Sequence, residues 1–147
     1  MSAPVIWVVI PLLMAGVVWF LQKDHAAALG ISLFVCGGLL AAAWLLTLDQ
    51  AVKVGSLTVE IPATLSIFGR RLVLTDSDRP LLMFLFALGA FWMAGEWTLG
   101  SSAFFPSLGL ALLGLSVAAL AVDPFLYAAL IIEVMVLLSI PMLAPPG

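Results

Sequence analysis

One carboxylate, Glu133, lies near the middle of an apolar stretch that covers residues 123–145. The stretch is long enough to cross a lipid bilayer, and a carboxylate at that depth is energetically costly, so it marks a functional site by default. On a helix its same-face neighbours are all apolar and cannot pair with it: Ala129, Leu130, Val136 and Leu137. A carboxyl group whose charge depends on a partner is the element that proton relays use.

Glu133 is therefore the predicted catalytic residue, with proton transfer as its role. The alternative is a protonated side chain that hydrogen-bonds a neighbouring helix. Four hydroxyl groups could line a water path to it, although each could instead bond the backbone: Ser107, Ser116, Tyr127 and Ser139.

Other chemistry finds little support in the sequence. Cys36 and His25 are each the single residue of their type, which leaves no thiol pair and no metal-ligand cluster. Phosphate-binding loops, nucleotide fingerprints and Ser–His–Asp sets are also missing from the sequence. We predict no cofactor and no metal. Asp123 is interpreted as the N-cap of the helix that carries Glu133, with Pro124 at its first position.

The composition predicts an integral membrane protein. Hydrophobic residues make up 65% of the chain and charged residues 9%, whereas a soluble domain carries about 25% charged residues. The partners expected from this composition are the lipid bilayer and other membrane subunits. Five Lys and Arg residues are too few for a nucleic-acid surface.

We expect a single membrane domain over residues 1–147, all-α, with about five transmembrane helices. Each predicted span is close to the roughly 20 residues that a bilayer requires. The spans are residues 5–21, 26–48, 80–97, 104–122 and 124–143.

Several residues refine these helices. Pro11 should kink the first span, because it removes a backbone hydrogen bond. Small residues should allow the second span to contact another helix closely: Gly30, Gly37, Gly38 and residues 41–43. The Gly- and Ala-rich fourth span should pack between neighbouring helices. The tryptophans of the third span, Trp92 and Trp97, could mark a membrane interface.

Residues 49–79 form an extramembrane loop that holds most of the charges. Apolar and polar residues alternate from Leu57 onward and are interrupted by Pro62 and Gly69, which favours a short β-hairpin. An irregular loop is the alternative. Residues 76–78 are good N-cap types for the helix that follows.

The segment LVLTDSDRPLLMFLFALGAFW precedes a Gly/Ala-rich helix, and DPFLYAALIIEVMVLLSIP follows that helix. This order of elements resembles that of a known family. The chain is similar to the N-terminal third of the antiporter-like, proton-pumping subunits of respiratory complex I, the NADH-quinone oxidoreductase. Membrane-bound hydrogenase and cation/proton antiporter subunits share this family.

The resemblance implies that Glu133 is the family's membrane-embedded glutamate, which pairs with a Lys on a later helix. It places the 49–79 loop on the outer face of a prokaryotic inner membrane. The Lys and Arg count argues the reverse, because four of the five lie in that loop, and we follow the resemblance. Without the later helices, we expect a truncated or split subunit with no independent enzyme activity. Two alternatives stay open: a non-catalytic membrane scaffold and a small oligomeric ion transporter.

Overall fold

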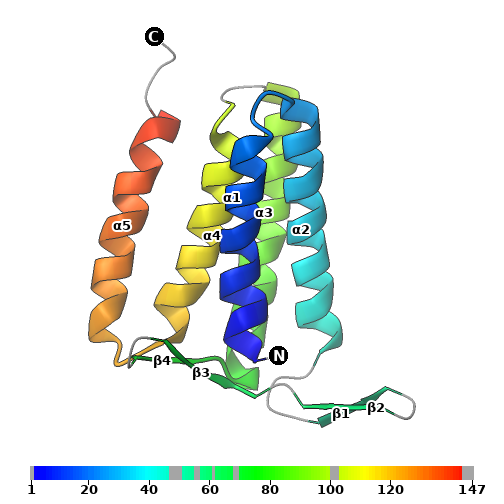
Figure 1. The fold of residues 1–147 in the computed structure, drawn as a ribbon, viewed down its shortest axis with the longest axis vertical. Helices are drawn as coiled ribbons and strands as arrows, with labels where there is room; N and C mark the ends of the chain where they lie inside the picture. The colour runs from blue at the N-terminus through cyan, green and yellow to red at the C-terminus, as the bar shows by residue number, and fades with distance from the viewer. Residues whose placement is uncertain are drawn as a thin grey trace.

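The computed structural model describes residues 2–46, 51–54, 57–60, 62–67, 70–99 and 103–143. Within these ranges, five α-helices stand side by side and short β-strands lie across one end of the bundle (Figure 1). The helices are α1 (Ile10–Phe20), α2 (His25–Leu45), α3 (Arg79–Leu99), α4 (Phe105–Ala121) and α5 (Leu126–Leu143). The prediction of five helices is confirmed.

Two helical segments of the described chain, His25–Leu45 and Asp76–Leu99, are long and apolar enough to cross a membrane. The other three are apolar but shorter: Val5–Phe20, Phe105–Ala121 and Leu126–Met142. Length and composition alone therefore support two spans rather than the five predicted.

The first helical segment changes its winding before Pro11. The π-helix η1 (Val5–Val9) precedes α1, and the Ile10 N–H donates to the Val5 carbonyl, five residues back. Since Pro11 has no N–H to continue an α-helical ladder, a wider turn fits at this point. The predicted disturbance at Pro11 is thus a π-helical segment.

The loop between α2 and α3 contains two antiparallel hairpins, where the sequence predicted one. Strands β1 (Ala51–Val54) and β2 (Leu57–Glu60) form the first, and β3 (Thr64–Ile67) and β4 (Arg70–Val73) form the second. The two-residue strand β5 (Val122–Asp123) adds to β4 and makes a three-stranded sheet. The alternation of apolar and polar residues therefore predicted real strands.

The capping role predicted for Asp123 is wrong. Asp123 pairs with Arg71 in the sheet, and α5 begins three residues later at Leu126. Pro124 lies in the intervening bend rather than at the first helical position. The strand pairing accounts for the error, because it holds Asp123 outside the N-cap position.

The predicted cap residues 76–78 lie directly before α3, but they form a helix of their own whose N-cap is Thr75. The short 3₁₀-helix η2 (Asp76–Asp78) leads into α3, and Asp78 Oδ2 accepts hydrogen bonds of 2.9 Å from both the N–H and the hydroxyl of Thr75. At the start of α3, Arg79 Nε donates to the Ala43 carbonyl at 2.7 Å, and its Nη2 donates to Trp44 O. A cation at carbonyls of a helix C-terminus is favourable, so Arg79 joins the end of α2 to the start of α3.

Helix α4 packs between neighbours, as predicted. It contacts α1, α5, α3 and α2, and most of its residues are buried. A methyl group added at Gly114 would lie 2.9 Å from Leu12 Cγ and 3.3 Å from the Val8 carbonyl. Gly114 therefore allows α1 to approach α4 closely.

The glycines of α2 do not have the predicted packing role. A methyl group at Gly30, Gly37 or Gly38 would meet no atom within 4 Å. The buried face of α2 is formed by other residues: Ala28, Leu29, Ser32, Val35, Cys36, Leu39 and Ala43. The glycines lie off that face, because these buried residues follow the three-to-four-residue spacing of one helix side.

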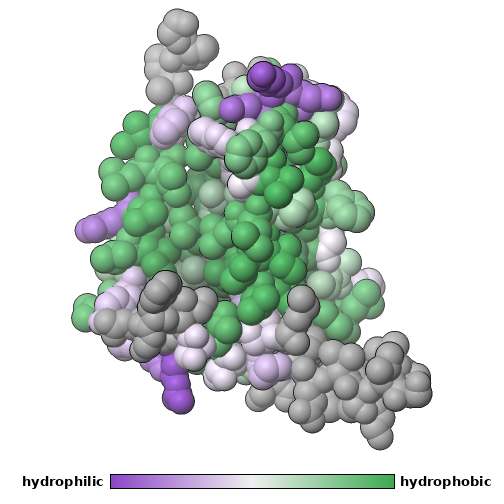
Figure 2. Space-filling model, in the orientation of Figure 1, coloured by the Kyte–Doolittle hydropathy of each residue, from purple (hydrophilic) through white to green (hydrophobic). Residues whose placement is uncertain are grey.

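The flank of the bundle is hydrophobic. On the face shown in Figure 2, hydrophobic residues cover most of the flank and hydrophilic residues lie mainly toward the two ends, with one protruding midway along the left flank. Large exposed apolar side chains occur on α1, α2, α3 and α5, among them Leu13, Phe34, Leu45, Phe84, Phe91, Leu130 and Leu137. Trp19, Trp44, Trp92 and Trp97 are also exposed.

Candidate functional site

Glu133 lies in the middle of α5 and points away from the bundle. The side chain is exposed, as are its same-face neighbours Ala129, Leu130, Val136 and Leu137. Within the described residues, Glu133 makes no hydrogen bond and no ion pair. It is thus a single carboxylate on an outward apolar helix face.

The position of α5 explains this exposure. Helix α5 packs against α4 at the edge of the bundle (Figure 1), so one side of α5 is covered and the opposite side is open. Ala128 and Met135 lie on the covered side, and Glu133 does not. The apolar neighbours predicted for Glu133 are correct, but they surround it on a surface.

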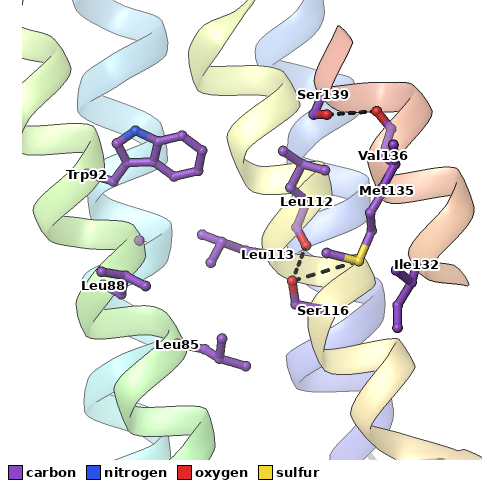
Figure 3. Close-up of a pocket in the computed structure, with 11 residues that line it drawn as sticks. Leu85, Leu88, Trp92, Leu112, Leu113, Ser116, Ile132, Met135, Val136 and Ser139 are labelled. Atoms are coloured by element: carbon purple, nitrogen blue, oxygen red, sulfur yellow. Dashed lines mark hydrogen bonds between the residues drawn. The ribbon is translucent and has the colours of Figure 1, made fainter. Parts of the chain in front are cut away.

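A hollow of about 360 Å³ separates α5 from α3. Figure 3 shows its lining, with Leu85, Leu88 and Trp92 from α3 facing Ile132, Met135 and Ser139 from α5, and Leu112, Leu113 and Ser116 of α4 between them. Its lining is almost entirely apolar. Glu133 is not among the lining residues, although its same-face neighbour Val136 is.

Three of the four hydroxyl groups that could line a water path donate hydrogen bonds to backbone carbonyls: those of Ser107, Ser116 and Ser139. Ser107 Oγ donates to the Ala15 carbonyl at 3.0 Å and joins α4 to α1. Ser116 and Ser139 donate within their own helices, to Leu112 O and Val136 O, each at 2.7 Å (Figure 3). Ser116 Oγ also lies 4.0 Å from Met135 Sδ. These three serines act as helix and interhelix hydrogen-bond donors.

A second acid, Glu96, is buried. Its side chain on α3 is 2% exposed, and Glu96 Oε1 lies 4.0 Å from His25 Nε2 on α2. This separation allows a charge interaction but exceeds a hydrogen bond. His25 Nε2 is itself buried and has no hydrogen-bond partner among the described residues. The pair lies at the end of the bundle opposite the sheet, because His25 begins α2 and Glu96 is three residues from the end of α3.

The sequence interpretation missed this pair because it considered His25 only as the single histidine of the chain. A signal was present in the spacing of the third helix. Glu96 continues the buried stripe of Leu82, Phe86, Gly89 and Met93, which repeats every three or four residues. That spacing predicts an inward-facing carboxylate.

Among the described residues, no three His, Cys, Asp or Glu side chains are grouped as metal ligands. Comparisons with protein-family models, curated proteins and solved structures found no match to this chain.

Proposed function

We propose that this chain is the N-terminal part of a proton-translocating membrane subunit in a complex I-like NADH-quinone oxidoreductase, with Glu133 as its proton-carrying group. The observation that carries the proposal is the single carboxylate on the open, apolar face of α5. An ionisable group facing lipid would be costly, and such groups normally face a bundle interior or a water-filled cavity. A further helix, in the same chain or another subunit, would therefore cover this face.

The hydrophobic flank supports a position in the membrane. Exposed apolar side chains cover the helices between hydrophilic ends (Figure 2), and a water-soluble surface would not expose so many. Exposed tryptophans lie toward both ends of the helices, with Trp19 and Trp97 at one end and Trp44 at the other. Tryptophan is enriched at the two membrane–water interfaces.

The edge position of α5 supports a larger assembly. Helix α5 has α4 as its main helical neighbour, and the rest of its surface carries large apolar side chains: Phe125, Leu126, Leu130, Ile132, Val136, Leu137 and Ile140. A cationic side chain on a covering helix would stabilise the ionised form of Glu133. Protonation of Glu133 would then depend on the charge of its partner, as a proton carrier requires.

Purification from native membranes in a mild detergent tests the assembly. The proposal predicts that a tagged chain brings down redox subunits and that the eluate reduces quinone. A homo-oligomer without redox partners would contradict it and favour a small transporter. Co-purification of redox subunits followed by normal proton transfer in the Glu133→Gln variant would favour a scaffold.

A further inference from the structure

The His25–Glu96 pair has features that a purely structural contact does not need. The Glu96 carboxylate is buried among apolar side chains, and the nearest cation-forming group in the described chain is the imidazole of His25 at 4.0 Å. His25 is 35% exposed over its side chain, while its Nε2 atom is buried. The imidazole therefore reaches both the surface of the protein and a buried carboxylate.

We propose that His25 and Glu96 form a second proton-transfer site, which admits protons at the end of the bundle opposite the sheet. In this step, the imidazolium Nε2–H bond of His25 breaks and an O–H bond forms on Glu96 Oε1. Neutral imidazole and a neutral carboxylic acid remain, so one proton moves and no electrons are exchanged. His25 keeps its Nδ1 proton, and the vacated Nε2 must rotate to the surface, where it takes the next proton from a hydronium ion or a buffer acid.

The surroundings limit the groups that can take part. The turn before α2 contributes Lys23 and Asp24, both exposed, and Asp24 accepts a hydrogen bond from the Ala27 N–H as the cap of α2. The segments Ile10–Phe20 and Phe105–Ala121 contain no charged residue. In α3 the other charged residue, Arg79, is at the opposite end. Glu96 is therefore the acid positioned to exchange a proton with His25.

Glu96 also faces the interior side of α3. It lines a hollow of about 530 Å³ with Leu88, Phe91, Trp92, Gly95, Leu99 and Phe105. Leu88 and Trp92 also line the hollow between α3 and α5 in Figure 3. The two hollows thus adjoin, and they extend from the side of Glu96 toward the helix that carries Glu133.

The test measures proton transfer by the complete complex in sealed vesicles, with quinone reduction as the measure of assembly. This inference rests on the proposed function. We expect Glu96→Gln and His25→Ala to lower proton transfer by roughly tenfold or more, since a positioned proton-transfer group contributes about 10²–10⁴-fold. Added imidazole should restore transfer in His25→Ala, whereas pyrrole, a similar ring without a basic nitrogen, should not. Lys23→Ala, in the same turn, serves as the control and should transfer protons normally.

The outcomes separate this proposal from the function of Glu133. Normal transfer by Glu96→Gln or His25→Ala, with Glu133→Gln inactive, would overturn the second site and leave the proposed function standing. Equal rescue by imidazole and pyrrole would show that His25 only fills space, and would overturn the proton-transfer role. Loss of quinone reduction in Glu96→Gln, with transfer per quinone unchanged, would likewise show a structural role. Absence of proton transfer by the unmodified complex would overturn both proposals.

Discussion

At the scale of single residues, the two acids of the helical region differ in environment. Glu96 is buried beside a histidine, whereas Glu133 is exposed on an apolar helix face. The energetic cost of burying the Glu96 carboxylate is offset within the described chain, because His25 provides an opposite charge when protonated. If α5 lies in a membrane, a group that covers this helix must offset the cost of the Glu133 carboxylate there.

Arg79 offers a residue-level test of how α2 and α3 are joined. The Arg79→Gln variant loses charge-assisted hydrogen bonds to the carbonyls of Ala43 and Trp44. We expect the free energy of unfolding to fall by about 1.5–3 kcal/mol, the contribution of hydrogen bonds to charged groups. Denaturation of the purified protein in detergent micelles measures the change.

Arg71→Gln is the matched control, because Arg71 is exposed in strand β4. It should leave the unfolding free energy within about 0.5 kcal/mol of the original value. Equal losses for the two variants would contradict the role assigned to Arg79.

At the scale of elements, close packing depends on which glycine faces a neighbour. The sequence identified the Gly- and Ala-rich character of both α2 and α4, and it predicted close packing for each. The prediction of close packing is confirmed for Gly114 and is wrong for Gly37 and Gly38. Composition counts small residues, but it does not determine which side of a helix the neighbouring helices cover.

Gly114→Ala and Gly38→Ala test this difference. An added methyl at Gly114 must displace Leu12 of α1 or the η1 backbone at Val8, so we expect a loss of about 1–3 kcal/mol in unfolding free energy. At Gly38 the methyl meets open space, and the higher helix propensity of Ala should stabilise the protein by up to about 1 kcal/mol. Denaturation in detergent measures the unfolding free energy of both variants. A change of the same sign in both variants would contradict the packing of α1 on α4.

The strands show what local sequence patterns can and cannot predict. The alternation in residues 57–74 predicted strand structure, because period-two patterning is local. The pairing of Val122 with Leu72 joins segments about fifty residues apart, and no local pattern specifies it. This pairing also explains why Asp123 is not the cap that its position before Pro124 suggested.

At the scale of the whole molecule, the helices carry the sheet and the His25–Glu96 pair at opposite ends (Figure 1). If the bundle crosses a bilayer, these two ends face different compartments. The family resemblance places the strands on the outer face, whereas the count of Lys and Arg residues would place them inside.

Cysteine labelling in cells decides between these orientations. Ser77→Cys lies at the sheet end and Lys23→Cys at the other, and both positions are exposed. A membrane-impermeant thiol reagent should label Ser77→Cys in spheroplasts and Lys23→Cys only after permeabilisation. Cys36 is buried and provides the unlabelled background in the unmodified chain. The reverse pattern would contradict the proposed orientation, and labelling of both in intact spheroplasts would contradict a membrane-spanning bundle.

The central claim is that Glu133 carries protons, and proton transfer by the Glu133→Gln variant of the complete complex tests it most directly. Gln keeps the size of the side chain but cannot bind or release a proton in the same way, so proton transfer should be abolished while assembly and subunit content stay unchanged. Asp123→Asn, an exposed carboxylate outside the helices, is the control and should transfer protons normally. Proton transfer by assembled Glu133→Gln at the rate of the unmodified complex would contradict the account.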